Sequence, residues 1–348
     1  MKLNSNFIKE PMLIHLAIRN FINYILLNAY SANSAGFYNG KSGIALCLFE
    51  IARVFDDETL EDKAFELLQE ALVLSDKNKI IDFENGLSGV GFVLLYLIEN
   101  RFLDADFKEL FGEQENFIRS EISKTIDFSE KDLPLVYFAV LVSRFQNSLE
   151  YSFMKGNILN KVGELLEKKL DEFDSPHSNV IKSDVLNNFE FYLKVCLRCK
   201  DYTVPVSLVE KYMQLFRQGK IAAGFATGYY LEQTTLNLQQ PDITAVAQTI
   251  MENAAQNIYP HLLTLSQRID LLYLSSRDDQ RYQKQISPLE KDLFDTDDAQ
   301  YEKKIIQSIP FRRLIAGYGF GLARLLLYWV YMENKRNRRD CSRFNYLF

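Results

Sequence analysis

The stretch that decides the fold is residues 36–52, GFYNGKSGIALCLFEIA, in which a glycine-bounded turn opens a helix with almost no polar face. The turn is GKSG at residues 40–43, and the apolar residues follow it directly. The same design returns at residues 84–98, ENGLSGVGFVLLYLI, where GLSG at residues 86–89 opens another apolar run. The two turns lie 46 residues apart. A fixed period of 20–50 residues indicates stacked supersecondary units.

This 46-residue period predicts where further units begin. Continued beyond residue 86, it reaches positions 132, 178, 224, 270 and 316. Gly224 lies on this series, and Gly317 lies one residue beyond its last member. The period therefore predicts seven units along the chain.

Each unit is predicted to contain an amphipathic outer helix and an apolar inner helix. Residues 60–74 place leucine and alanine on one face and acidic residues on the other, which is typical of a helix with one solvated side. Residues 88–98 have no polar face, so that helix should be buried on most sides. Seven such pairs predict an all-α fold, an α/α toroid or double α-barrel, with residues 1–348 as one domain. Its last outer helix is expected over residues 289–309.

Because the units share one orientation, the inner helices should run parallel, with their N-termini at one mouth. A helix start leaves backbone N–H groups without intrahelical partners and carries the positive end of the dipole, which suits ligand oxygens. Aromatic, amide and carboxyl side chains there suit an extended peptide backbone. The binding residues expected at this mouth are Tyr38, Asn39, Glu84, Asn85, Asp270 and Tyr318. Alanine at Tyr38 and Tyr318 is expected to leave thermal stability within a few degrees.

Composition limits the class of protein. Of 348 residues, 47% are hydrophobic and 25% charged, which is ordinary for a globular protein in water. The net charge of −6 gives no reason to expect nucleic acid, and the basic cluster in residues 335–339 is interpreted as a solvated helix end. The apolar runs are too short to span a membrane, and residues 1–16 lack a signal-peptide pattern. With four cysteines, a cytoplasmic location is expected.

The glycine-opened segments resemble those of the lanthionine synthetase C-like family, whose enzymes close thioether rings in ribosomally made peptides. The resemblance rests on GFYNGKSGIAL and ENGLSGVGFVLLYL, on KIAAGFATGYY at residues 220–230, and on LIAGYGFGLARLLLYW at residues 314–329. Its spacing extends over essentially the whole chain. It implies an α/α toroid and, as partner, a precursor peptide or a peptide-modifying enzyme.

The resemblance also implies a catalytic zinc, and here the sequence departs from the family. The family binds zinc through two cysteines and a histidine in loops near the mouth, and an open position admits the peptide thiol. Here IAG at residues 315–317 replaces the last Cys-His-Gly motif, which supplies zinc ligands. Ala223-Gly224 replaces an earlier His-Gly, whose histidine is the family's proposed acid/base. Ile269 lies where the other cysteine is expected. No zinc and no other cofactor are therefore expected.

Two functions remain as alternatives. We favour a non-catalytic pseudoenzyme of a peptide-maturation pathway that binds a precursor peptide or a partner enzyme at the mouth. The alternative is a metal-independent enzyme such as a glycoside hydrolase, in which two carboxylates face each other at about 5–10 Å. Its candidate carboxylates are Asp82, Glu84, Glu232 and Asp270. Cys196 and Cys199 are interpreted as part of an apolar helix rather than as half of a metal site.

Overall fold

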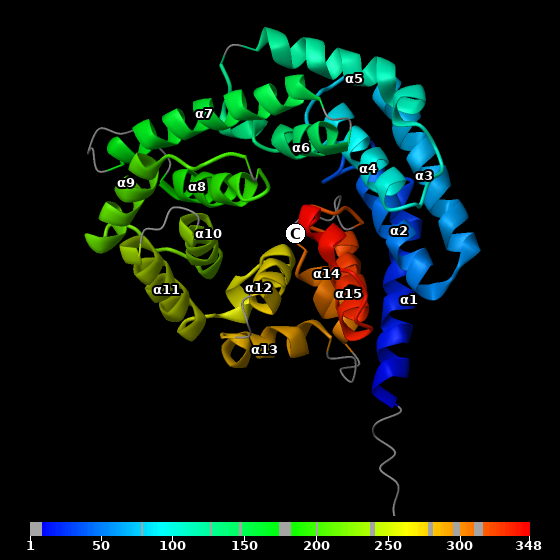
Figure 1. Cartoon of the computed structure of the whole chain (residues 1–348). Coiled ribbons are helices and arrows are strands. Elements are labelled where there is room, and N and C mark those ends of the chain that lie inside the picture. The colour runs from blue at the N-terminus through cyan, green and yellow to red at the C-terminus, as the bar shows by residue number, and fades with distance from the viewer. Residues whose placement is uncertain are drawn as a thin grey trace, which may run out of the picture. The chain divides into compact units, whose positions relative to one another are not determined.

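The computed structural model of the chain describes residues 9–77, 79–125, 127–145, 148–173, 182–199, 201–236, 241–277, 281–294, 300–309 and 316–348. Every regular element in these ranges is a helix (Figure 1), so the predicted all-α class is confirmed. The chain divides into two compact units, one formed by residues 1–114 and 259–348 and the other by residues 115–258. The single-domain organisation stays a prediction.

The first unit contains inner helices that are covered by outer ones. The inner helices are α2 (Lys41–Phe55), α4 (Leu87–Glu99), α12 (Leu265–Arg277) and α15 (Leu322–Arg336). The other helices of this unit are α1 (Lys9–Ala29), α3 (Glu58–Lys77), α13 (Gln283–Leu293) and α14 (Tyr301–Gln307), with the short 3₁₀ helices η2 (Pro260–Leu262) and η4 (Ser342–Tyr346). Helix α2 is buried all round over residues 41–52, whereas α3 buries one face. The predicted contrast between inner and outer helices is confirmed for this pair.

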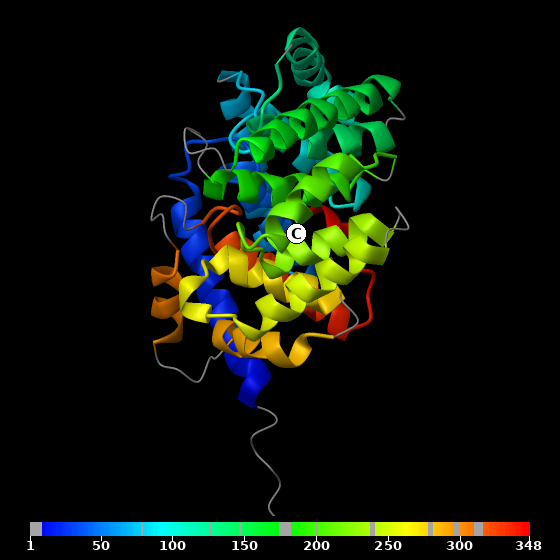
Figure 2. The same cartoon turned by 90° about the vertical axis from the view of Figure 1, so that its left-hand side faces the viewer.

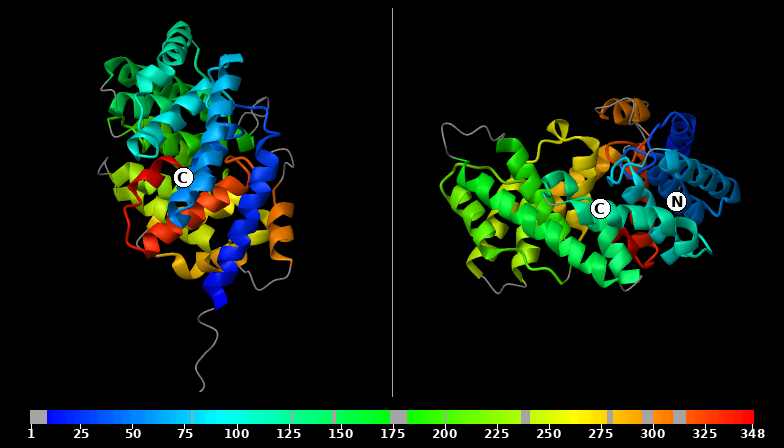
Figure 3. Two further views of the ribbon diagram at one scale, coloured as in Figure 1. Left: turned by 90° about the vertical axis from the view of Figure 1, so that its right-hand side faces the viewer. Right: turned by 90° about the horizontal axis from the view of Figure 1, so that it is seen from above.

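The inner helices of the first unit pack in the order α12, α15, α2, α4, and α1 lies against α15 (Figures 1 and 3). Because α2 and α15 touch, the first and last helix pairs meet, as a toroid requires. Helices α12 and α15 run parallel, since Asp270 pairs with Arg324 near their starts and Ser276 contacts Tyr331 near their ends. The predicted common direction of the inner helices is confirmed for this pair.

The second unit repeats the alternation of helices (Figure 2). Its helices are α6 (Leu135–Phe145), α7 (Leu149–Asp171), α8 (Lys182–Cys196), α9 (Val206–Arg217), α10 (Phe225–Leu236) and α11 (Pro241–Gln256). Helix α5 (Phe107–Lys124) crosses the boundary between the units, and the 3₁₀ helix η1 (Glu130–Asp132) precedes α6. Helix α7 contacts α6, α8 and α9, and α10 contacts α8 and α11.

The prediction for the last helix pair is wrong in two respects. The outer helix expected over residues 289–309 is two helices, α13 and α14, and residues 295–299 between them lie outside the described ranges. The residue before α15 is Gly321, five residues beyond the expected position 316, so the period slips in the last unit. By contrast, Gly224 directly precedes α10, as the period predicts.

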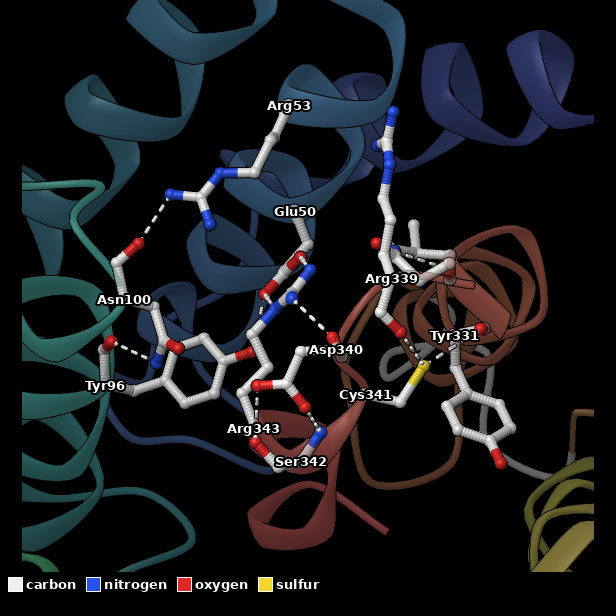
Figure 4. A network of polar contacts seen from close by, with 12 residues as sticks. Glu50, Arg53, Tyr96, Asn100, Tyr331, Arg339, Asp340, Cys341, Ser342 and Arg343 are labelled. Carbon is white, nitrogen blue, oxygen red and sulfur yellow. Dashed lines mark hydrogen bonds and ion pairs between the residues drawn. The ribbon is translucent and has the colours of Figure 1, made fainter. Parts of the chain in front are cut away.

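A buried polar network joins the inner helices α2 and α4 to η4 (Figure 4). Glu50 on α2 is 0% exposed, and Arg343 donates to both of its oxygens, Nε to Oε1 at 2.8 Å and Nη2 to Oε2 at 3.0 Å. Tyr96 on α4, one period after Glu50, donates its hydroxyl to Oε1 at 2.5 Å. Burial alone would lower the pKa of Arg343, but its bonds to Glu50 raise it. A fully buried carboxylate requires such partners.

Candidate functional site

Three loops of the first unit meet at the starts of α2, α4 and α15 (Figure 1). We call residues 34–40, 80–86 and 317–321 the loop cluster. Each loop ends in a glycine with extended backbone that directly precedes its helix. The predicted convergence of helix starts is therefore confirmed for these three helices.

Backbone hydrogen bonds hold the loop cluster together. The amide of Gly36 donates to the carbonyl of Asn85 at 2.9 Å, and the amide of Tyr38 donates to the carbonyl of Glu84 at 3.1 Å. On the other side, the amide of Gly319 donates to the carbonyl of Tyr38 at 2.8 Å. The loop of residues 34–40 is thus bonded to both of the other loops. These bonds bring together side chains from distant parts of the sequence.

The glycines that open the inner helices allow a close approach between helix and loop. An ideal Cβ on Gly43 would lie 1.9 Å from the carbonyl oxygen of Phe37. One period later, an ideal Cβ on Gly89 would lie 2.1 Å from the carbonyl oxygen of Phe83. Both positions therefore exclude any side chain, which explains why the glycine recurs in the repeat.

Several amides at these helix starts already have partners within their own loops. Lys41 N donates to Ser34 O at 3.0 Å, and Leu87 N, one period later, donates to Ile80 O at 2.8 Å. The amide of Ser42 is also bonded, to the carbonyl of Ala35. The expectation that these helix starts offer free N–H donors to a ligand is therefore wrong for these groups.

Aromatic rings fill the interior of the loop cluster. Phe37, Phe83 and Tyr318 each lie three residues before the glycine that ends their loop. Ring centroids are 5.5 Å apart for Phe37 and Phe83, and 4.2 Å apart for Phe37 and Tyr318. Tyr318 is 0% exposed, so it is a core residue of the site. The expectation that alanine at Tyr318 leaves stability nearly unchanged is wrong, because such truncations cost about 3–5 kcal/mol.

The outer surface of the loop cluster carries the other predicted residues. The ring of Tyr38 is half-buried and stacks on Tyr318 with centroids 5.8 Å apart. Asn39, also half-buried, donates from Nδ2 to Oδ1 of the exposed Asn85 at 3.2 Å, so two amides one period apart are joined. Glu84 is exposed beside them. This surface offers an aromatic ring, two amides and a carboxyl group.

Asp82 and Glu84 have different roles in their shared loop. The Oδ1 atom of Asp82 accepts the amide of Asn85, so Asp82 stabilises the turn before α4. Crowding by neighbouring protein atoms and the nearby Asp82 carboxylate raise the pKa of Glu84. Glu84 is nevertheless exposed, whereas Asp82 is half-buried, so Glu84 is the more accessible carboxyl group of this loop.

Asp270 joins the site through Arg324, a residue that the sequence reasoning missed. Arg324 donates from Nη2 to Oδ1 of Asp270, and its guanidinium lies 4.9 Å from the ring centroid of Tyr318. Arg324 is 6% exposed, whereas the side chain of Asp270 is 31% exposed. Burial alone would lower the pKa of Arg324, but Asp270 raises it, so the side chain stays cationic. All six predicted binding residues thus lie in the first unit.

The carboxylates suggested for hydrolysis are engaged in other contacts. Asp270 is held in an ion pair with Arg324, so its carboxylate already has a partner. Glu232 lies in the second unit, where it is buried and accepts from Gln248 Nε2 at 2.8 Å. These contacts give the two-carboxylate alternative no support.

The described residues do not fit a zinc site. Ala316 and Ala223 carry no donor atoms, and Ile315 lies outside the described ranges. Burial raises the pKa of Cys196, and that of Cys199 to about 12, so both thiols favour the protonated form. Within the described part of the chain, no group of three or more His, Cys, Asp or Glu residues could hold a metal ion.

The sequence contains a signal that could have identified Arg324 and Glu50. Each is the one charged residue of a long apolar run, ALCLFEIA around Glu50 and GLARLLLYWV around Arg324. A charge in a helix buried on all sides requires an opposite charge and hydrogen bonds. Such a residue therefore predicts a buried partner, although the sequence does not name that partner.

Across the described ranges, no helix has both the length and the apolar character that a membrane span needs.

Comparison with known proteins supports this assignment of the loops. No curated protein matches the chain. The family model for lanthionine synthetase C-like protein matches residues 10–133, which include α1 to α4 and two of the three loops of the loop cluster. Residues 10–133 of the chain are thus similar to the lanthionine synthetase C-like family.

Proposed function

We propose that this lanthionine synthetase C-like protein acts in the maturation of ribosomally made peptides, binding an extended segment of a precursor peptide at the loop cluster without chemistry of its own. The observation that carries the proposal is the surface formed by Tyr38, Asn39, Glu84 and Asn85. An aromatic ring supplies contact area, and the amides can both donate to and accept from a peptide backbone. The backbone bonds between the loops hold these groups in place before a ligand arrives.

The proposal assigns no zinc and no other cofactor to the chain. Its support is Ala316, where the family resemblance implies a metal-binding histidine, and Ala223, where it implies an acid/base histidine. A cytoplasmic location is part of the proposal, because all four cysteines are free thiols, as in proteins of reducing compartments. A peptide-modifying enzyme is the other partner class that the resemblance implies, and the experiment below distinguishes it from a peptide.

A displayed library of random dodecapeptides provides a probe that assumes no ligand sequence. Selection on the wild-type protein should enrich peptides whose affinity falls at least about ten-fold for Tyr38→Ala, since removing an aromatic anchor typically costs about 2 kcal/mol. The variant keeps the backbone bonds of residue 38. Its fold can be checked through the fluorescence of Trp329, the one tryptophan of the chain, which lies in the first unit.

Tyr259→Ala is the matched control, because Tyr259 is an exposed tyrosine of the same unit outside the loop cluster. It should bind the enriched peptides as tightly as the wild-type protein does. Enrichment of peptides that bind Tyr38→Ala equally well would contradict the proposed site. Failure to enrich any peptide would contradict peptide binding and favour a folded partner enzyme.

A further inference from the structure

Arg324 occupies a position that is unfavourable for a cation. It is the third residue of α15, within the first turn of the helix, where the positive end of the dipole favours anions instead. It is also 6% exposed, so its charge is largely removed from water. The helix dipole and the burial both disfavour an arginine at this position. A compensating interaction is therefore needed.

The interactions that Arg324 makes leave part of its hydrogen-bonding capacity unused. Tyr318 and Phe348 lie close to the guanidinium, with ring centroids 4.9 Å and 5.6 Å from its central carbon. Among the described residues, the guanidinium donates to one acceptor, Asp270, through Nη2. Nε is buried and has no acceptor in these ranges. An unmet buried donor typically costs about 1–3 kcal/mol, more for a charged group.

Asp270 connects this arginine to solvent and to the loop cluster. Its side chain is 31% exposed while that of Arg324 is 7% exposed, so the ion pair opens on the Asp270 side. The guanidinium lies 4.9 Å from the ring centroid of Tyr318, and the ring of Tyr38 stacks on that of Tyr318, so Arg324 lies close to the proposed peptide surface. A ligand carboxylate that reaches Asp270 therefore also comes close to the guanidinium to which Asp270 is bonded.

We propose that Arg324 recognises a carboxylate of the bound peptide, from an aspartate, a glutamate or the peptide C-terminus, and that Asp270 is the resident competitor for the same guanidinium. Arginine suits this role because its planar fork pairs with two carboxylate oxygens at once. The inference rests on the proposed peptide-binding function and adds to it a preference for acidic ligands. Asp270 limits that preference, since its own carboxylate occupies and neutralises the guanidinium.

The test compares two dodecapeptide libraries that differ only in one central residue, glutamate in one and glutamine in the other. Asp270→Asn removes the competing charge and keeps the shape of the side chain. The ratio of retained glutamate peptides to retained glutamine peptides should therefore rise by about ten-fold, which corresponds to a charge-assisted hydrogen bond of about 1.4 kcal/mol. The double variant Asp270→Asn/Arg324→Gln should return this ratio to about one without stranding a buried charge. Asp292→Asn, in the ion pair with Arg268, is the matched control and should leave the ratio unchanged.

The outcomes separate this inference from the proposed function. An unchanged ratio in Asp270→Asn, together with binding that still depends on Tyr38, would overturn the role of Arg324 and leave the peptide-binding proposal standing. An equal rise in Asp292→Asn would also overturn it, because net charge alone would then explain the preference. Retention of neither library by any variant would overturn the inference and the proposed function together.

Discussion

Replacing Arg343 with methionine is expected to lower the free energy of unfolding by about 3–5 kcal/mol, because it strands a fully buried carboxylate. Glu50 is 0% exposed and receives two hydrogen bonds from Arg343 (Figure 4). The bond from the Tyr96 hydroxyl remains in the variant but brings no positive charge. Urea unfolding followed by the fluorescence of Trp329 measures this loss in the first unit, where all three residues lie.

A double variant and an exposed pair serve as controls for this result. Glu50→Gln/Arg343→Met removes both charges, so its loss should be smaller than that of Arg343→Met alone. Lys63→Met breaks an ion pair with Glu66 in which both side chains are more than 40% exposed, and it should leave the urea midpoint nearly unchanged. Equal losses for Arg343→Met and Lys63→Met would show that the buried network is not what holds η4 against α2.

Alanine at Gly43 or Gly89 is expected to destabilise the protein by about 3 kcal/mol, the upper end of the range for overpacking. In each case the new methyl group would lie about 2 Å from a backbone carbonyl oxygen, so the loop or the helix must move. Backbone is harder to displace than a flexible side chain, and each loop is also bonded to its neighbours. Thermal unfolding followed by circular dichroism measures the effect.

The matched control is Gly112→Ala in α5, where the new methyl group would meet only Lys108 Cβ at 4.0 Å. Alanine has the higher helix propensity, so this variant should gain up to about 1 kcal/mol. If Gly43→Ala and Gly89→Ala are as stable as Gly112→Ala, the close contact of helix and loop does not explain the recurring glycines.

The helix pairs of the first half of the chain could be predicted because local sequence determines them. The turns at Gly40 and Gly86 are followed by runs with no polar face, and both runs form helices buried nearly all round. The last outer helix could not be predicted in this way, because its periodicity does not reveal the break between α13 and α14. Similarly, Gly317, Gly319 and Gly321 are near neighbours, and the sequence pattern does not distinguish Gly321 as the residue before α15.

The sequence could predict which residues of the candidate site come together, but not which of them are buried. Tyr38, Asn39, Glu84 and Asn85 come together because the repeat places their loops at equivalent positions of neighbouring helices. By position in its loop, Tyr318 corresponds to Phe37 and Phe83, which makes it part of the core rather than of the surface. Arg324 and Arg343 depend on partners far away in the sequence, Asp270 and Glu50, and no local pattern pairs them.

We expect the loop cluster to hold a peptide and to leave the thiols of that peptide unchanged. The most direct measurement uses a library of synthetic peptides that each carry one cysteine and one dehydroalanine, incubated with the immobilised protein in the presence of added zinc. Retained peptides are eluted and treated with a thiol-alkylating reagent, and their molecular masses are measured by mass spectrometry. We expect peptides to be retained and every retained peptide to gain one alkyl group. Retained peptides that gain none, because the thiol has added to the dehydroalanine, would contradict this expectation.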